Sequence, residues 1–562
     1  MAGFDETFDF VVVGSGGGSM CAGLLMRSQG KRVLILEKTE YVGGTSARSG
    51  GVMWIPNNRF MKRDGVADSP EQALTYLEAT AGQSGDDAPG ASVERRTAYV
   101  TEAPKMVDFL VDQGIRLNRV PYWPDYYDDR PGGSEQGRTV VAEIFNKKEL
   151  GPWADKLQPG FLEMPAALDD AMKIKTAKFS WAGKKMLATI AGRTILAKLR
   201  GQHWVSAGAA LQGRMLQAAL RAGVDIRTDS PVHELIEEDG RIVGVVTERK
   251  GKRWRVRAEL GVLVNAGGFA KNQEMRDEYQ PGTRADWSIV TKGDTGEMIR
   301  EMARHGAALA QMDAMVGYQH SIPPGTEQSM ARVGMQAVTA APHAILVDRT
   351  GVRYMNEGGS YELYCRTMLK RERETGKAVP SWAVFDSQYT GRYMGLGNAL
   401  PAKAIGGWIE SGYMKRADSI EALAAAMEVD PATLKDTVDR FNGFARAGRD
   451  EDFQRGERAY DRWLGDAHHP SSATLGTIER GPFYAMPVVP GDVGTYGGVV
   501  TDDRARVLRE DGSVIPGLYA TGISTASVMG RSYPGAGASV GPSFVWGFVA
   551  AKNAANAENV AG

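Results

Sequence analysis

A tyrosine lies against glycine-rich backbone near the C-terminal end of the sequence, in the segment 531–542. Tyr533 offers a phenol O–H, and Gly537 offers an amide N–H four residues later. Two donors of this kind could bind one carbonyl oxygen, as the donors of an oxyanion hole do. The alternative is a tight glycine turn before a helix, with Tyr533 as a packing residue. Other parts of the chain have to decide between the two interpretations.

Two further segments concentrate tyrosine residues. Tyr126 lies in the aromatic-dense loop 120–127. Tyr361 follows a segment that we expect to open with a strand at Arg353 and to continue through a polar turn. Tyrosines are common packing residues in loops and small domains, so neither segment alone indicates a function.

The N-terminus carries the sequence pattern of a dinucleotide-binding βαβ unit. A fold built on this unit would have to position the candidate tyrosines. Residues 8–13 and 31–36 are predicted strands, and a predicted helix over 20–29 lies between them. The turn after the first strand could bind a pyrophosphate through its backbone and the helix N-terminus. Glu37 ends the second strand, where a carboxylate can accept a hydrogen bond from a ribose hydroxyl. The candidate phosphate-binding residues are Gly14, Ser15, Gly16, Gly17, Gly18 and Ser19.

A second loop rich in glycine and serine follows Glu37 and favours FAD, bound non-covalently, over NAD. It suits a ligand that runs onward over backbone, and later strand–glycine turns would close the site. The further candidate cofactor residues are Lys38, Gly43, Gly44, Thr45, Ser46, Ser49, Gly50, Gly51, Val232, Ala266, Gly267, Gly268, Gly522, Ala538, Ser539 and Val540.

Composition limits the class of protein. A chain of 562 residues predicts two or more domains. A net charge of −1 gives no drive toward nucleic acid. Two cysteines, no basic and apolar leader and no apolar run of about 18 residues favour a soluble cytoplasmic protein. The pair His468-His469 lacks further ligands at metal spacing, so we expect no metal site.

Five ordered motifs together resemble the 3-ketosteroid Δ1-dehydrogenases, within the flavoprotein superfamily that contains fumarate reductase. They are Gly14-Ser-Gly-Gly-Gly, Glu37-Lys-Thr followed by Gly-Gly-Thr-Ser, Pro124-Asp-Tyr-Tyr, Asn356-Glu with Tyr361, and Tyr533-Pro-Gly-x-Gly. The resemblance implies an α/β fold in which a Rossmann-like FAD-binding domain (1–312 and 493–562) contains an inserted α+β catalytic cap (313–492).

The resemblance also implies a reaction in steroid degradation, in which a 3-ketosteroid gains a double bond between carbons 1 and 2. Tyr533 and Gly537 would bind the 3-keto oxygen. Tyr361 would take the proton from carbon 2, and Tyr126 would ease its ionisation. A hydride would pass from carbon 1 to flavin N5, and an external acceptor, quinone-like or unknown, would reoxidise the flavin. Two departures from the family pattern are Ser360 and Ala536, where proline is common.

Three alternatives remain at this point. A Δ4-(5α)-ketosteroid dehydrogenase would share the cofactor and the substrate class. A fumarate reductase-like enzyme would need Arg and His to hold carboxylates, and a flavin electron-transfer module would not need a cap. Within the site, Tyr122, Tyr127, Tyr364 and Tyr496 are neighbouring candidates for the assigned tyrosine roles.

One segment is not explained by this fold. Residues 171–200 contain eight Lys or Arg and no acidic residue, interleaved with large apolar side chains. This composition is typical of a helix in a membrane interface, and equally of a basic helix packed on the core. The first interpretation predicts a peripheral contact with the cytoplasmic membrane face through this insert.

Overall fold

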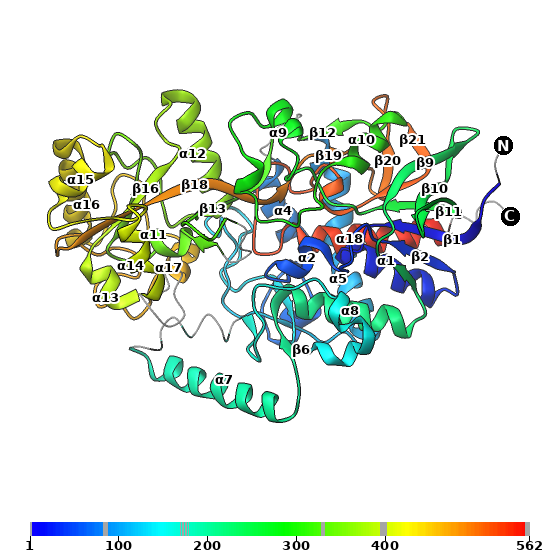
Figure 1. The fold of residues 1–562 in the computed structure, drawn as a ribbon, viewed down its shortest axis with the longest axis horizontal. Helices are drawn as coiled ribbons and strands as arrows, with labels where there is room; N and C mark the ends of the chain where they lie inside the picture. Colours follow the sequence, from blue (N-terminus) through cyan, green and yellow to red (C-terminus); the bar gives the residue numbers. More distant parts are fainter. Residues whose placement is uncertain are drawn as a thin grey trace.

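The fold is built around two sheets. A computed structural model describes residues 3–82, 88–168, 170, 174, 177, 179–327, 332–393 and 402–556, without the side chains of residues 402 and 403. Figure 1 shows an elongated molecule with both chain termini at the end that contains the first sheet, and the second sheet at the other end.

The first sheet has eight strands and contains the predicted βαβ unit. Its main order is β20–β21–β11–β1–β2–β8, and β1 runs parallel to both β2 and β11. Its central strands are buried on both faces, which explains their continuous Val, Ile and Leu runs. The strands are β1 (Glu6–Val13), β2 (Val33–Leu36), β8 (Asp225–Arg227), β9 (Val232–Glu238), β10 (Arg241–Arg249), β11 (Lys252–Val264), β20 (Arg506–Leu508) and β21 (Val514–Ala520).

The two ends of the chain pack together on this sheet. Helix α1 (Gly17–Ser28) lies against the last helix, α18 (Val540–Asn556). A side chain on Gly547 would overlap the backbone of Gly18, so glycine permits the close approach. The packing brings the loop before α18, with Tyr533 and Gly537, next to the first glycine loop.

The second sheet belongs to the segment between β12 (Leu309–Ala310) and β19 (Gly498–Val499). Its main order is β14–β13–β18–β16–β15, and β17 pairs with β18. These elements and the helices around them, residues 315–495, are called the cap below. The strands are β13 (Met315–Ser321), β14 (Val333–Gly334), β15 (Ala344–Val347), β16 (Ser381–Phe385), β17 (Lys415–Ala417) and β18 (Phe483–Thr495).

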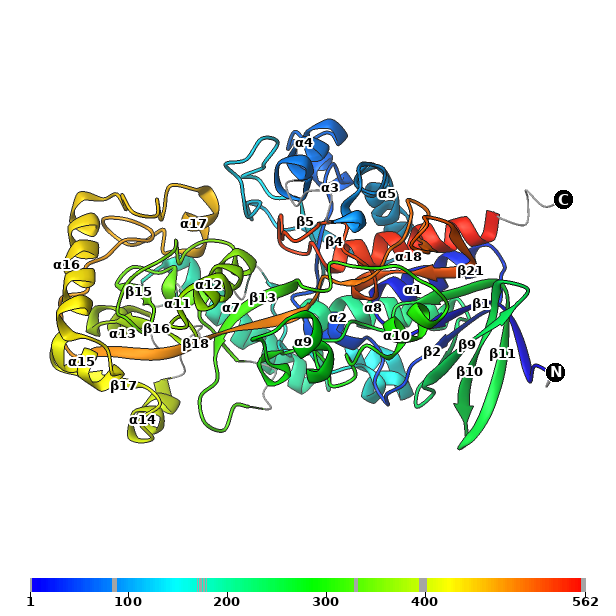
Figure 2. The same ribbon diagram turned by 90° about the horizontal axis from the view of Figure 1, so that it is seen from above.

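Helices cover the cap sheet, and Figure 2 shows β18 running from the cap toward the first sheet. The helices that begin at Ile420 and Pro431 each have a side-chain N-cap, from Ser419 and Asp430 respectively. The cap helices are α11 (Gln336–Thr339), α12 (Tyr361–Thr375), α13 (Ser387–Tyr393), α14 (Ala402–Glu410), α15 (Ile420–Met427), α16 (Pro431–Ala447) and α17 (Ala459–Leu464).

The strand expected to open at Arg353 is wrong. The strand β15 ends at Val347, and residues 350–360, all of them described, contain neither helix nor strand. The buried guanidinium of Arg353 pairs with Glu357 at 2.7 Å and Asp450 at 2.9 Å. Because Arg353 turns back to a carboxylate four residues later, the chain cannot stay extended here.

The remaining elements connect and cover the two sheets. Among the described helices, none is long and apolar enough to cross a membrane. The remaining helices are α2 (Gly44–Arg48), α3 (Arg59–Arg63), α4 (Pro70–Thr80), α5 (Val93–Asp112), α7 (Trp181–Leu199), α8 (Ala207–Arg221), α9 (Gln273–Tyr279) and α10 (Glu297–Arg304). The remaining strands are β3 (Val52–Trp54), β4 (Leu117–Arg119), β5 (Thr139–Ala142), β6 (Phe145–Asn146), β7 (Trp204–Val205), β12 (Leu309–Ala310) and β19 (Gly498–Val499).

Candidate active site

One cavity of about 1430 Å³ joins the first glycine loop to the three tyrosines. Its walls come from both sheets and from the C-terminal loop. The predicted residues that line it are Gly14, Ser15, Gly16, Glu37, Lys38, Gly44, Thr45, Ser46, Ser49, Gly50, Tyr126, Val232, Ala266, Gly267, Tyr361, Gly522, Tyr533, Gly537, Ser539 and Val540. The segments predicted separately for a cofactor and for ketone chemistry therefore share one space.

The first loop has the shape that a dinucleotide requires. Gly14 has φ +92°, and a side chain there would overlap the Asn265 carbonyl. The Ser15 hydroxyl donates to Glu37 Oε2 at 2.5 Å, and the Thr39 N–H donates to Glu37 Oε1 at 2.9 Å. These donors hold the Glu37 carboxylate at the cavity wall, where it can accept from a ribose hydroxyl.

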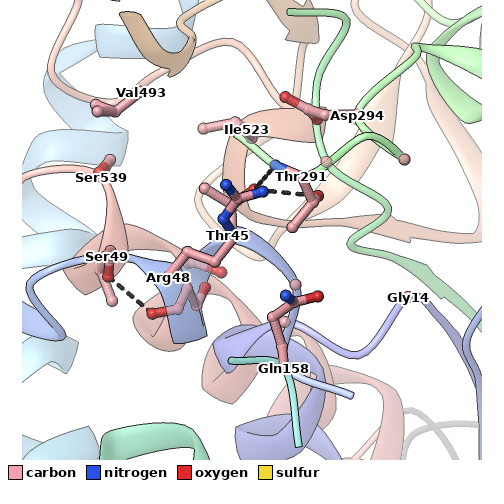
Figure 3. Close-up of a pocket in the computed structure, with 18 of the residues that line it drawn as sticks. Gly14, Thr45, Arg48, Ser49, Gln158, Thr291, Asp294, Val493, Ile523 and Ser539 are labelled. Carbon is pink, nitrogen blue, oxygen red and sulfur yellow. Dashed lines mark hydrogen bonds between the residues drawn. The ribbon is translucent and has the colours of Figure 1, made fainter. Parts of the chain in front are cut away.

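The second loop forms the short helix α2. Gly43 precedes α2 in the left-handed region, with φ +113°. The Thr291 N–H donates to Thr45 Oγ1 at 3.2 Å, and the Ser49 hydroxyl donates to the Ser46 carbonyl at 2.8 Å. Figure 3 shows Thr45 and Thr291 together near the centre of the pocket view, with Ser49 and Ser539 to their left.

Seven predicted cofactor residues do not line the cavity. Most support it from behind: Gly17 packs against Phe544, Gly18 against Ser543, and Gly51 against the backbone of α8. The Gly268 N–H donates to an Asp294 carboxylate oxygen. The seven are Gly17, Gly18, Ser19, Gly43, Gly51, Gly268 and Ala538.

Asp294 lines the cavity and was missed from the sequence. Its side chain is buried, and its Oδ2 has no hydrogen-bond partner among the described residues. Burial raises the pKa of this carboxyl to about 7, although the Gly268 N–H acts in the opposite direction. A buried acceptor without a partner in a ligand cavity fits a ligand hydroxyl. The only available signal was a Gly-Asp-Thr-Gly turn at 293–296.

The three tyrosines converge from three distant segments. The ring centroids of Tyr361 and Tyr533 lie 5.2 Å apart, those of Tyr126 and Tyr361 5.3 Å, and those of Tyr126 and Tyr533 5.8 Å. The Tyr533 hydroxyl lies 3.1 Å from Ser539 Oγ. Burial, and then the neighbouring Tyr126 and Tyr533, raise the pKa of Tyr361 well above its ordinary value of 10.

The backbone around Tyr533 is held by residues of the Tyr126 loop and of α4. The Tyr126 N–H donates to the Pro534 carbonyl at 2.9 Å, and the Tyr76 hydroxyl donates to the same carbonyl at 2.6 Å. Gly537 has φ +92°, and a side chain there would overlap the Val52 carbonyl. Within the described chain no hydrogen bond is recorded from the Gly537 N–H, so this donor can serve a ligand.

The other tyrosines named from the sequence lie elsewhere. Tyr122 is 69% exposed. Tyr364 is buried in the cap core, with its hydroxyl 3.4 Å from Thr339 Oγ1. Tyr127 and Tyr496 are buried beside the site, but neither lines the cavity.

Tyr460 is a site residue that sequence reasoning missed. Its ring centroid lies 4.3 Å from that of Tyr126, and its hydroxyl accepts a hydrogen bond from Gln336 Nε2 at 3.2 Å. Asp128 fixes its position, because the Asp128 carboxylate accepts from the N–H groups of Ala459 and Tyr460 at the start of α17. No motif marks Tyr460, since only the fold brings α17 to the loop of Tyr126.

Comparison with known proteins agrees with this geometry. The profile of the family described as "FAD binding domain" matches residues 9–540. The chain is 36% identical to a 3-oxosteroid 1-dehydrogenase of Mycolicibacterium smegmatis, over 97% of each chain. It is 32% identical to a 4-oxocyclohexanecarboxylate 2-dehydrogenase of Sinomonas cyclohexanicum, over 98% of this chain and 93% of the other.

A solved structure gives the same result. The 3-ketosteroid Δ1-dehydrogenase of Sterolibacterium denitrificans, in complex with 1,4-androstadiene-3,17-dione, superposes with a TM-score of 0.90 and 34% identity. The match covers 98% of this chain and 100% of that one. The glycine cradle at Gly14 and the unpartnered Asp294 oxygen fit the cofactor of that fold. This chain therefore belongs to the 3-oxosteroid 1-dehydrogenase family of FAD-binding oxidoreductases.

Proposed function

We propose that the protein oxidises 3-ketosteroids to their 1-ene derivatives, as part of steroid or sterol degradation. The observation that carries the proposal is the single cavity in which Tyr126, Tyr361, Tyr533 and Gly537 meet the dinucleotide loop. A proton next to a carbonyl can be removed only if the developing enolate is stabilised. Tyr533 O–H and Gly537 N–H are the two donors that can stabilise it.

Tyr361 is the proposed base for the proton of carbon 2. A buried phenol with a raised pKa is a poor base unless donors stabilise its anion. A ketone bound at Tyr533 would occupy the Tyr533 O–H, whose oxygen lies 3.1 Å from Ser539 Oγ. Tyr126 could then donate its own O–H to the Tyr361 oxygen.

A chain of donors can orient Tyr126 for this role. An amide N–H can only donate, so Gln336 Nε2 fixes the Tyr460 oxygen as an acceptor. The Tyr460 O–H is then free to point at Tyr126. The rings of the two tyrosines pack against each other. This leaves the Tyr126 O–H for Tyr361.

FAD, when bound, supplies the acceptor for the hydride of carbon 1. Its adenosine end is assigned to Glu37 and its pyrophosphate to the backbone of Gly14–Gly16. Asp294 is assigned to a cofactor hydroxyl. The loop Gly537–Val540 is the wall assigned to the flavin ring, and an external acceptor, which we propose to be quinone-like, completes the cycle.

The domain division proposed from the sequence suits this reaction. The FAD-binding domain, 1–312 and 493–562, supplies Tyr126, Tyr533 and Gly537. The inserted domain of this division, 313–492, supplies Tyr361 on α12. A hinge between the two would let substrate enter and would then exclude water.

The Δ4-(5α) and fumarate reductase-like alternatives are less well supported. Tyr126, Tyr361 and Tyr533 form a tight cluster suited to removing a proton next to a ketone. A fumarate site would instead require cationic side chains beside the base, whereas Tyr361 is surrounded by Tyr126, Tyr318 and Tyr533.

A cyclic keto acid is the second candidate substrate, since a relative is named for one. Arg48 lines the cavity and its Nε, buried, has no hydrogen-bond partner among the described residues. Its Nη1 donates to the Val290 carbonyl at 3.1 Å. A guanidinium with a spare donor can bind a carboxylate, while the desaturation next to the ketone would be unchanged.

Anaerobic mixing tests the proposal directly. Addition of androst-4-ene-3,17-dione should bleach the flavin absorbance, and 1,4-diene product should appear with an artificial acceptor. Bleaching by 4-oxocyclohexanecarboxylate but not by the steroid would favour the second candidate. Bleaching by neither would overturn both.

We further propose that α7 docks the protein on an anionic membrane. The outer face of α7 carries Trp181, Ile195 and Leu199, whose exposed fractions are 85%, 62% and 81%. Their spacing of 14 and 4 residues places them on one side of the helix. Lys184 and Lys185 lie exposed beside this stripe. An apolar stripe flanked by lysines suits a membrane interface.

The segment before the insert connects α7 to the cavity. The inner face of α7 packs through Ile190 on Ala166 and Ile174, while Phe161 and Leu168, which precede the insert, line the cavity. Phe161 is 42% exposed, so the wall that it forms reaches the surface. Figure 1 shows α7 at the lower edge of the molecule, apart from both sheets. A lipophilic steroid could thus pass from a lipid surface into the cavity.

A further inference from the structure

The chain neighbours of the three site tyrosines meet in a second buried cluster. Tyr127 follows Tyr126, Glu362 follows Tyr361, and Ser532 precedes Tyr533. The Tyr127 hydroxyl donates to Glu362 Oε2 at 3.3 Å. None of the three neighbours lines the cavity, so the cluster does not touch substrate or cofactor.

Arg366 and Tyr496 complete this cluster. Arg366 lies one turn after Glu362 on α12, with its Nε 3.6 Å from Glu362 Oε1. Its Nη1 donates to the Arg531 carbonyl at 2.9 Å. The Tyr496 hydroxyl donates to the Ser532 carbonyl at 2.8 Å. Glu362 is therefore linked to the backbone of both loops, through Tyr127 on one side and Arg366 on the other.

The burial of the Glu362 carboxylate indicates what this cluster does. Glu362 is 3% exposed, and burial raises the pKa of its carboxyl to about 7 while the Arg366 charge acts in the opposite direction. A buried carboxylate with two polar partners is costly to keep, and apolar residues of similar size would often be at least as stable. Such a group is better explained by the geometry that it specifies than by stability.

We propose that Glu362 is a positioning residue that sets Tyr361 against Tyr126 and Tyr533. Cap helix α12 begins at Tyr361, and its next residue ties the helix to the two loops that carry the other tyrosines. Loss of this tie would leave the cofactor in place and would displace the base from the carbonyl-binding donors. A displacement of about 1 Å can cost about 100-fold in rate. The inference rests on the proposed function.

The test compares Glu362→Gln, Tyr127→Phe and the double variant, all loaded with FAD. Each single variant should lower kcat for androst-4-ene-3,17-dione by about 10-fold or more, with KM changed by less than about twofold. The isotope effect on kcat for substrate deuterated at carbon 2 should rise, because proton removal becomes slower. The double variant should be no slower than the worse single variant, because both remove one interaction.

Asp348→Asn is the matched control. Asp348 is a buried carboxylate that pairs at 2.9 Å with Arg371, a residue of α12 like Glu362. It does not contact either tyrosine loop. This variant should lose thermal stability and keep the wild-type isotope effect. A kcat within twofold of wild type in Glu362→Gln, additive losses in the double variant, or an isotope effect in Asp348→Asn raised as much as in Glu362→Gln would each overturn the proposal.

A failure of the proposed function is distinguishable from a failure of this inference. If the wild-type protein does not oxidise the steroid, the proposed function is wrong. The tie is then measured by a double-mutant cycle on the melting temperature of the FAD-loaded protein. Coupling between Glu362→Gln and Tyr127→Phe would support the tie, and additive shifts would overturn it.

Discussion

Tyr126 and Tyr361 pack edge to face, with ring centroids 5.3 Å apart and ring planes at 76°. Tyr126 belongs to the loop between β4 and β5, and Tyr361 begins a cap helix. The proposed proton transfer therefore depends on how the cap sits on the rest of the chain. Each prediction below separates this arrangement from cofactor binding or from stability.

Tyr533→Phe should keep FAD and lose most turnover. The variant removes one of the two proposed donors to the substrate carbonyl, and loss of one such donor lowers kcat by about 100-fold to 1000-fold. Flavin absorbance per chain and steady-state rates give the two readouts. A rate near that of the wild type would mean that Tyr533 is a packing residue in a turn.

Turnover should rise with pH because the proposed base must be ionised. Burial raises the pKa of Tyr361 above 10, so its phenolate fraction grows throughout the accessible range. Tyr126→Phe removes the donor that we assign to that phenolate once the ketone is bound, and should lower kcat at pH 8 by about 10-fold or more. Tyr364→Phe, in the cap core, is the control and should behave as the wild type. A flat profile between about pH 6 and 9 would argue against a phenolate base.

Sequence patterns could predict the fold and the glycine loops that line the cavity. Gly14 and Gly537 are recognisable because their backbone angles exclude other residues, and such constraints act locally. The tyrosine roles came from the family resemblance, because the spacing of Tyr126 and Tyr361 along the chain does not predict that the two residues are in contact. Tyr460 and Asp294 were missed for the same reason, since only tertiary packing brings Tyr460 against Tyr126 and Asp294 to the cavity wall.

Asp294→Asn should weaken FAD binding by about 10-fold or more, because an amide nitrogen cannot accept the hydrogen bond assigned to Oδ2.

The same substitution should stabilise the apoprotein. Burial raises the carboxyl pKa from 3.8 to about 7, so ionisation destabilises the fold as pH rises from about 4 to 7. The melting temperature of the apo variant should exceed that of the wild type, by a margin that grows over this range and is level above pH 7. A margin that does not change with pH would contradict the raised pKa.

Membrane docking by α7 should require its exposed apolar stripe. Replacement of Trp181, Ile195 and Leu199 by Ser should abolish co-sedimentation with anionic liposomes, and deletion of 172–200 should do the same. Val93→Ser with Val352→Ser is the control, because these side chains are also exposed but lie far from α7 in sequence. Turnover of a detergent-solubilised steroid should stay within about twofold in all variants, since α7 does not line the cavity. Equal pelleting of the wild type and the triple variant would mean that α7 is a basic helix that packs on the protein through its inner face, against Ala166 and Ile174.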